Sequence, residues 1–312
     1  MFPRKSSISA QRGVTLVELL VAVTLMLMVT LATVALYTVN SSSKRTVDAS
    51  QELDDTARFV FELVGQALRN AGYPNSVPIE EAVGTYSNLF DGCAGAANTE
   101  PCPVLGFDDS VVSGSNYGAA GSGAPNASDS LAVRFYGSSQ RNASGLMVTD
   151  GTVVTCSGRR VQASTVAGEL GLSVFWIKML NGDPELYCTD DDGTGAGRST
   201  DAIARGVESF QVLYGVDACS GTPCVFDGVP DRWVSASDVA ATDWRSVKAV
   251  RIGLVLRGAP GSSQASDGND LYPFGKDFVT GYTGAGAVFT PPSDSRLRRV
   301  YSTTYLLRNP PA

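Results

Sequence analysis

The sequence predicts an α+β fold in which one long N-terminal helix is packed on a head built from an antiparallel β-sheet. An apolar run with helical character occupies residues 14–39, and an amphipathic helical pattern follows over residues 40–72. Short alternating segments and glycine-rich loops then fill residues 73–312, which we expect to form a β-rich globular head. Residues 1–13 form a separate leader.

The apolar run reads VTLVELLVAVTLMLMVTLATVALYTV, and Glu18 is the only charged residue between Val14 and Ser43. At about 1.5 Å per residue, such a helix is long enough to cross a hydrocarbon core of roughly 30 Å. The apolar core of a cleaved secretory signal is usually shorter, about 7–15 residues. The leader carries basic residues and no acid (Arg4, Lys5, Arg12), which favours its retention in the cytoplasm.

Glu18 is the residue of this run that demands an explanation. A carboxylate inside a membrane helix is costly and marks a functional position. The only cation that could reach it is a new α-amino group, created if the chain is cut just before Val14. Glu18 would lie one turn from that amine and could pair with it, or it could be protonated.

The helix is expected to continue beyond the membrane and to run from about Val14 to Ala71. Its second half carries apolar residues at spacings of three and four (Leu53, Ala57, Val60, Phe61, Val64, Ala67, Leu68, Ala71). Gly72 is a suitable C′ residue and Pro74 prevents the helix from resuming. This stripe packs against the head or, as an alternative, forms a coiled-coil dimer through residues 44–71.

Strands are expected in five segments of the head: DSLAVRFYG, the run from Val174 to Met179, VESFQVLYG, VKAVRIGLVLRG and RRVYSTTYLLRN. Their alternation indicates half-buried strands of one antiparallel sheet that covers the helix stripe. Loops are expected at about 107–129, 189–201 and 258–292. We expect the three tryptophans, Trp176, Trp233 and Trp244, to be buried or half-buried.

Composition excludes several kinds of chemistry. The chain has no histidine, which removes Ser-His-Asp and Cys-His catalysis and mixed Cys/His zinc sites. Its net charge of −7 and the lack of a basic patch argue against a nucleic-acid partner. The 31 acidic residues allow many carboxylate pairs, but no pattern selects one. We therefore expect no enzymatic activity and no cofactor.

Six cysteines allow 15 disulfide connectivities. Pairing of nearest neighbours predicts Cys93–Cys102, Cys156–Cys188 and Cys219–Cys224. The alternative is a set of reduced, buried thiols, which would suit a reducing compartment.

Two acidic clusters are candidate calcium sites. Asp190, Asp191 and Asp192 precede Gly193 but fail the EF-hand spacing, so we interpret them as solvated turn residues. Asp217, Asp227 and Asp231 flank the proposed Cys219–Cys224 bridge and are weak candidates for calcium ligands. Turn and capping roles explain them better, and no metal is expected.

The segment from Arg12 to Ala22, RGVTLVELLVA, resembles the class III signal of type IV prepilins and pseudopilins. The resemblance implies that a prepilin peptidase cuts after Gly13 and N-methylates Val14, and that Glu18 is the family's glutamate at mature position five. In an assembled filament, Glu18 would then pair with the amine of a neighbouring subunit and set the axial register. Val14 is a departure, because phenylalanine or methionine is commoner there.

The head motifs DSLAVRFYG, TCSGRRV, PELYC, GVESFQVLYGVD, VPDRWVSA, VKAVRIGLVLR and RRVYSTTYLLRN occur in an order similar to the PilW family of minor type IV pilins. This resemblance also implies a bond between Cys156 and Cys188, and a lollipop-shaped subunit. Cys219 and Cys224 interrupt the loop that follows YGVD, where related sequences are acidic and glycine-rich.

The resemblance implies a minor pilin that primes pilus assembly and sits near the pilus tip. Its implied partners are other minor pilins, the major pilin, the prepilin peptidase, the assembly platform and a large tip adhesin. It would span the inner membrane once with its head in the periplasm, then join the surface fibre. The alternatives are a minor pseudopilin of type II secretion, or a periplasmic adhesin or enzyme on an uncleaved anchor.

Overall fold

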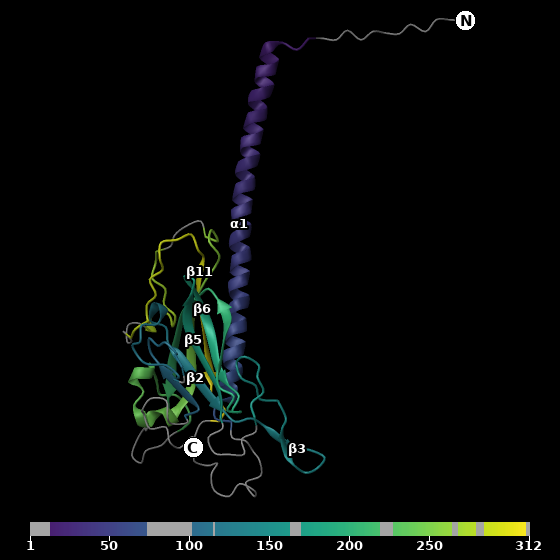
Figure 1. The fold of residues 1–312 in the computed structure, drawn as a ribbon. Helices are drawn as coiled ribbons and strands as arrows, with labels where there is room; N and C mark the ends of the chain where they lie inside the picture. The colour runs from purple at the N-terminus through teal and green to yellow at the C-terminus, as the bar shows by residue number, and fades with distance from the viewer. Residues whose placement is uncertain are drawn as a thin grey trace, which may run out of the picture. The chain divides into compact units, whose positions relative to one another are not determined.

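The computed structural model describes residues 13–73, 102–114, 116–162, 170–218, 227–263, 268–278 and 284–309. The chain divides into two compact units, Met1–Asp48 and Ala49–Ala312, and helix α1 contributes to both. Figure 1 shows α1 and the strands of the second unit. Each unit is described by itself below.

Helix α1 spans Leu16–Asn70, 55 residues, within two residues of the predicted bounds at each end. In the first unit every described residue up to Asn40 is exposed. The apolar part of α1 is long enough to cross a membrane. The first buried residue is Ala49, where the second unit begins.

In the second unit one face of α1 is buried, as the apolar stripe predicted. The buried residues are Ala49, Leu53, Ala57, Val60, Val64, Gly65, Ala67 and Leu68. The helix ends in the predicted way: Gly72 has a φ of +66° and donates its N–H to the carbonyl of Arg134 on the neighbouring strand. Because the stripe is buried within its own head, it is not available for the alternative coiled-coil dimer.

The head contains two larger antiparallel sheets instead of the single sheet that was predicted. The first has the order β1-β2-β5-β6-β7. Its strands are β1 (Val104–Phe107), β2 (Ser130–Phe135), β5 (Gly171–Leu180), β6 (Asp183–Asp191) and β7 (Ser199–Arg205). An Asn181-Gly182 turn with positive φ at both residues joins β5 to β6.

The second sheet has the order β11-β10-β8-β9. Its strands are β8 (Val207–Val216), β9 (Arg232–Val234), β10 (Val247–Arg257) and β11 (Arg298–Leu306). A separate hairpin pairs β3 (Ser139–Arg141) with β4 (Met147–Thr149). Short 3-10 turns occupy Pro125–Ala127, Ala236–Asp238 and Ala241–Ser246.

One hydrophobic core joins the helix stripe to the inner faces of both larger sheets. A smaller cluster, which includes Leu172, Val174 and Trp176, covers the other face of the five-stranded sheet. All residues of β2 are therefore buried. All residues of β8 in the other sheet are buried as well, and there Ala127 and Gly286 lie against Gln211. The prediction that these two strands are half-buried was wrong. The alternation of apolar residues in a strand shows which side chains share a face of the sheet. It does not show whether a second layer of the protein covers the outer face.

The loop predicted at 189–201 was also partly wrong, because β6 extends to Asp191 and β7 begins at Ser199. The prediction for the tryptophans is confirmed. Trp176 and Trp244 are buried, and Trp233 is half-buried with the Arg251 guanidinium 4.3 Å from its ring centroid.

The last strand, β11, holds α1 through two tyrosines. Tyr305 donates its hydroxyl to the carbonyl of Phe61 at 2.5 Å, and Tyr301 donates to Asp54 at 2.6 Å. Gly65 lies directly under the Tyr305 ring, where a Cβ would be 2.6 Å from a ring carbon. The glycine therefore permits a close approach of strand and helix.

Candidate functional site

The predicted processing site lies in the exposed chain just before α1. Gly13, Val14 and Thr15 have no regular secondary structure, and Val14 is 72% exposed. Among the described residues, and leaving out its chain neighbours, no atom lies within 4 Å of the place where a Cβ on Gly13 would be. The Gly13–Val14 peptide bond is therefore open to an enzyme in this structure.

Glu18 and Thr15 form a capping box at the start of the helix. The Thr15 backbone N–H and its hydroxyl both donate to Glu18 Oε2 at 3.0 Å, and the Glu18 N–H donates to Thr15 Oγ1 at 3.2 Å. These bonds satisfy backbone donors that a helix N-terminus otherwise leaves free. Threonine followed three residues later by glutamate is a sequence signal for this motif, and our sequence analysis did not use it.

Four threonines in the apolar half of α1 bond their hydroxyl groups to the helix backbone. The hydroxyls of Thr24, Thr30, Thr33 and Thr38 each donate to a backbone carbonyl three or four residues earlier. A hydroxyl bonded in this way does not need water, so these threonines are compatible with a hydrocarbon environment.

The head contains the predicted bond between Cys156 and Cys188. It links the turn formed by residues 155–159 to strand β6. Cys102 is also disulfide-bonded. The predicted pairs Cys93–Cys102 and Cys219–Cys224 involve Cys93, Cys219 and Cys224, which lie outside the described residues, and both pairings stay predictions.

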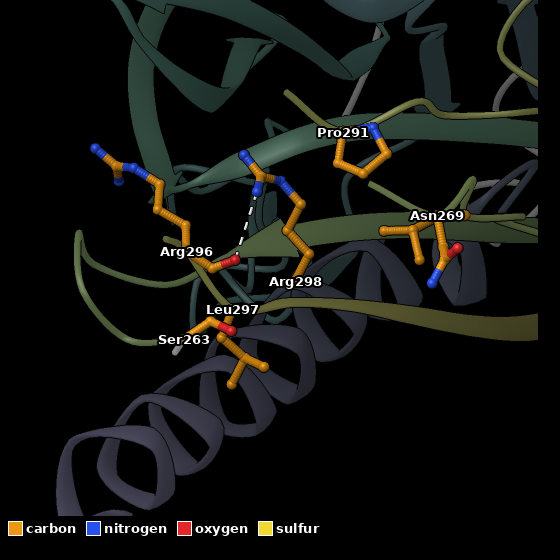
Figure 2. A pocket seen from close by; sticks show the side chains of 7 residues that line it. Ser263, Asn269, Pro291, Arg296, Leu297 and Arg298 are labelled. Atoms are coloured by element: carbon orange, nitrogen blue, oxygen red, sulfur yellow. Dashed lines mark hydrogen bonds between the residues drawn. The ribbon is translucent and has the colours of Figure 1, made fainter. Parts of the chain in front are cut away.

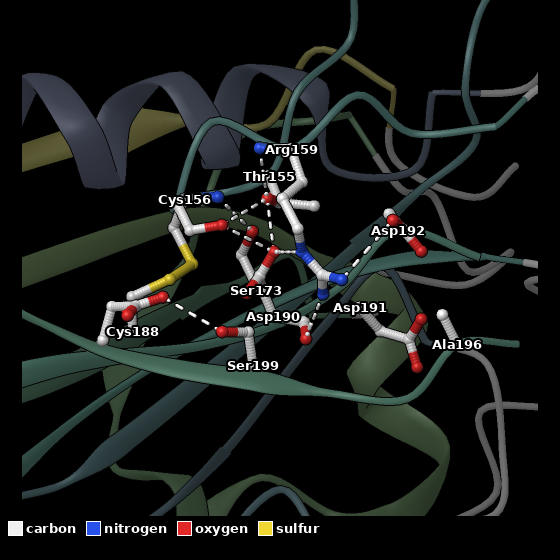
Figure 3. A network of polar contacts seen from close by, with 12 residues as sticks. Thr155, Cys156, Arg159, Ser173, Cys188, Asp190, Asp191, Asp192, Ala196 and Ser199 are labelled. Atoms are coloured by element: carbon white, nitrogen blue, oxygen red, sulfur yellow. Dashed lines mark hydrogen bonds and ion pairs between the residues drawn. A yellow bond between two sulfur atoms is a disulfide. The ribbon is translucent and has the colours of Figure 1, made fainter. Parts of the chain in front are cut away.

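Asp190 corrects the interpretation of the Asp190–Asp192 cluster as solvated turn residues. Its side chain is fully buried beside the disulfide, and its Oδ2 accepts hydrogen bonds from Thr155, Ser157 and Arg159 at 2.6–2.8 Å. The hydrogen bond to Asp190 raises the pKa of the Arg159 guanidinium. Figure 3 shows how the turn surrounds the carboxylate.

The carboxylates of Asp191 and Asp192 accept hydrogen bonds from residues two positions later in the chain. Asp191 accepts the N–H of Gly193, and Asp192 accepts the N–H and hydroxyl of Thr194. The sequence identified the acidic turn, but burial of its first member depends on a segment more than thirty residues earlier in the chain.

The second set of calcium candidates consists of Asp217, Asp227 and Asp231. Each of these carboxylates accepts a hydrogen bond from a backbone N–H group. Asp217 accepts the N–H of Gly228, Asp227 that of Val229, and Asp231 that of Ala218. These are turn and capping roles. Within the described ranges, no three acidic or cysteine side chains converge in a way that could hold a metal ion.

A cavity of about 170 Å³ lies beside the start of β11 and is lined by Ser263, Asn269, Leu271, Pro291, Arg296, Leu297 and Arg298 (Figure 2). Arg298 is 6% exposed and pairs with Glu208 and Asp294 at 2.6 Å each. Burial works against its charge, but the bonds to Asp294 and Glu208 prevail and raise the pKa of Arg298. With its charge compensated in this way, Arg298 stabilises the sheet instead of offering a free cation to a ligand.

Comparison with known proteins agrees with the resemblance seen in the sequence. Residues 8–34 match the family model described as the prokaryotic N-terminal methylation motif. Residues 174–309 match the family model described as type IV pilus-assembly protein W, PilW. The chain is a type IV prepilin-like protein of the PilW family.

The two matches cover structurally distinct parts of this PilW-family protein. The N-terminal match contains Gly13, Val14, the capping box and most of the apolar run. The PilW match begins inside β5 and includes all of β6 through β11. Cys188 and Asp190 lie within the second match, whereas their partners in the 155–159 turn lie before it.

Among solved structures, the chain is similar to a type IV-like pilin from Thermus thermophilus. The two share 14% sequence identity with a TM-score of 0.40, and the match covers 83% of this chain and 98% of that one. No curated protein sequence matches this chain at a significant level.

Proposed function

We propose that this PilW-family protein is a minor pilin that primes pilus assembly and is incorporated near the pilus tip. In this proposal it is a structural subunit, not an enzyme. The observation that carries the proposal is Glu18, a carboxylate in the exposed apolar half of α1, five residues after Gly13. Such a charge has no purpose in a simple anchor, where it would only weaken insertion.

The processing step follows from the exposed Gly13–Val14 bond. A prepilin peptidase at the inner membrane would cut after Gly13 and methylate the new amine of Val14. Removal of the leader also removes the cations Arg4, Lys5 and Arg12, which hold the N-terminus on the cytoplasmic side. The subunit then leaves the membrane with its apolar helix intact, and its head, proposed to lie in the periplasm, enters the fibre.

The capping box gives Glu18 a defined position before assembly. Both bonds from Thr15 end on Oε2, so the carboxylate stays at the helix start, one turn from Val14. Among packed apolar helices, an unpaired carboxylate would cost several kcal/mol, and pairing with the Val14 amine of an adjacent subunit removes that cost. Other minor pilins and the major pilin are the proposed neighbours.

The decisive experiment compares Glu18→Gln with Glu18→Ala. Glutamine keeps an oxygen that accepts the Thr15 N–H but cannot form the ion pair, whereas alanine loses both. We expect both variants to insert in the membrane, and both to be incorporated into sheared pili at a level at least about tenfold below wild type, since a lost buried ion pair exceeds 1.4 kcal/mol. Wild-type incorporation of Glu18→Gln would refute the charge-pairing role.

Two further measurements separate the proposal from its alternatives. N-terminal sequencing of the exported protein should find methylated Val14, and an intact Met1 would support an uncleaved anchor. A gene deletion should abolish surface pili and twitching while leaving type II secretion unchanged. The reverse pattern would identify a pseudopilin.

A further inference from the structure

The turn formed by residues 155–159 is held on strand β6 by polar contacts that do not involve sulfur. Thr155 Oγ1, Ser157 Oγ and Arg159 Nε all donate to one oxygen, Asp190 Oδ2, at 2.6, 2.8 and 2.8 Å. Arg159 Nη2 also donates to the backbone carbonyl of Asp190 at 2.9 Å. We call these contacts of Asp190 with Thr155, Ser157 and Arg159 the carboxylate clamp.

The clamp surrounds Cys156 in sequence and in space. Thr155 and Ser157 are its two neighbours, and the Cys156 N–H donates to Ser173 Oγ on β5 at 3.0 Å. On β6, Cys188 lies two residues before Asp190, so both side chains point to the same face of the sheet. The contacts that dock the turn on Asp190 therefore also direct the Cys156 side chain to Cys188, as Figure 3 shows.

The clamp is poorly explained as a device for stability alone. Asp190 is fully buried, and its second oxygen, Oδ1, has no hydrogen-bond partner among the residues that the structure describes. A buried, half-satisfied carboxylate costs free energy that an apolar side chain in the same place would not. Buried ion pairs of this kind are retained in some proteins because they select one arrangement among several.

We propose that the carboxylate clamp docks the 155–159 turn on β6 before oxidation and thereby selects Cys188 as the disulfide partner of Cys156. Arg159 and Asp190 are positioning residues in this step. The choice matters because six cysteines allow 15 connectivities. In the covalent step the two thiols lose two protons and two electrons to form the S–S bond, and a disulfide oxidant accepts both and becomes a dithiol.

The first test asks whether the turn is docked without the S–S bond. In the full-length Cys156→Ser/Cys188→Ser protein in detergent, hydrogen exchange is measured by mass spectrometry on a peptide covering residues 155–160. The amides of Thr155, Cys156 and Gly158 are all hydrogen-bonded in the structure. We expect protection to persist, and the addition of Asp190→Asn to accelerate exchange about tenfold or more, since bonds to charged groups are the strong ones.

Two controls keep this result specific. Asp243→Asn, which breaks the exposed pair with Arg232, should leave exchange in the turn unchanged. Amides of β10 report on the whole head and should keep their protection. The proposal is overturned if the turn is already unprotected without the disulfide, or if Asp190→Asn also exposes β10, because Asp190 would then support the head as a whole.

The second test follows the partner choice itself. Fully reduced protein is refolded with oxidised glutathione, and disulfides are mapped over time without reduction. Asp190→Asn and Arg159→Gln should each form the Cys156–Cys188 bond about tenfold more slowly than wild type, with Cys156 appearing in other pairs, while Asp243→Asn behaves as wild type. Wild-type kinetics and pairing in either clamp variant that folds would overturn the proposal.

Discussion

Replacement of Gly65 by alanine is expected to destabilise the head, although the same change stabilises an ordinary helix. In an open helix interior, alanine is favoured over glycine by about 1 kcal/mol. At position 65 the new methyl group would lie 2.6 Å from Cε1 and 3.0 Å from Cζ of Tyr305. No real Cβ contact is this short, so the tyrosine or the helix has to move.

The magnitude follows from what the movement breaks. Overpacking of this kind costs about 1–3 kcal/mol. Displacement of Tyr305 also weakens its hydrogen bond to the Phe61 carbonyl, which contributes about 1 kcal/mol. Since the gain in helix propensity offsets about 1 kcal/mol, we expect a net loss near 2 kcal/mol, or roughly 4–8 °C in Tm.

The assay is thermal or urea unfolding of the full-length protein in detergent. Gln66→Ala is the matched control, because Gln66 is the next residue of the helix and is exposed, so that change should not destabilise. In a Tyr305→Ala background the sign should invert, and Gly65→Ala should stabilise by up to about 1 kcal/mol. If Gly65→Ala stabilises the protein with Tyr305 intact, the argument from close approach is refuted.

Three further predictions concern the head. Glu208→Gln should lower the free energy of unfolding by about 3 kcal/mol, because it leaves the buried Arg298 guanidinium undercompensated; a loss below about 1 kcal/mol in urea unfolding would contradict this. The hydrogen bond from Arg298 lowers the pKa of Asp294, so its stabilising contribution is present above the unfolded pKa, near 3.9, and is lost as pH falls through the folded value. Asp294→Asn should therefore flatten the acid limb of the stability curve, and parallel curves for variant and wild type would count against this. Removal of the Cys156–Cys188 bond, which spans 32 residues, should cost about 3–4 kcal/mol, and unchanged unfolding of Cys156→Ser would argue against an entropic role.

Local patterns predicted the helix and five of the strands (β2, β5, β8, β10, β11), whereas six others were not predicted (β1, β3, β4, β6, β7, β9). The helix was placed within two residues at each end because an apolar run, a 3.6-residue stripe and a glycine stop are properties of neighbouring residues. The segment VKAVRIGLVLR became β10 in full for the same reason. The capping box of Thr15 and Glu18 is equally local and was visible in the sequence, although it was not used.

Apart from the strands that were not predicted and the loop bounds at 189–201, the errors concern which other segments cover a strand or side chain. The strands of the head were expected in one half-buried sheet, but β2 and β8 belong to different sheets and are buried on both faces. Asp190 was expected in solvent because aspartates before a glycine usually occupy turns. Its burial depends on Arg159, whose guanidinium compensates the charge from 31 residues away.

The sequence alone therefore determined the membrane-length helix, the N-terminal methylation motif, the lone acid at Glu18 and the membership of a pilin family. Each of these features depends on residues that are adjacent or a few helical turns apart, and backbone geometry fixes the relative positions of such residues. Only the tertiary structure decided that Gly65 packs against the Tyr305 ring, that the head has two larger sheets, and that Asp190 accepts hydrogen bonds from the turn that contains Cys156. Those relations join segments far apart in the chain, and their free energy exists only once the packed core has brought them together.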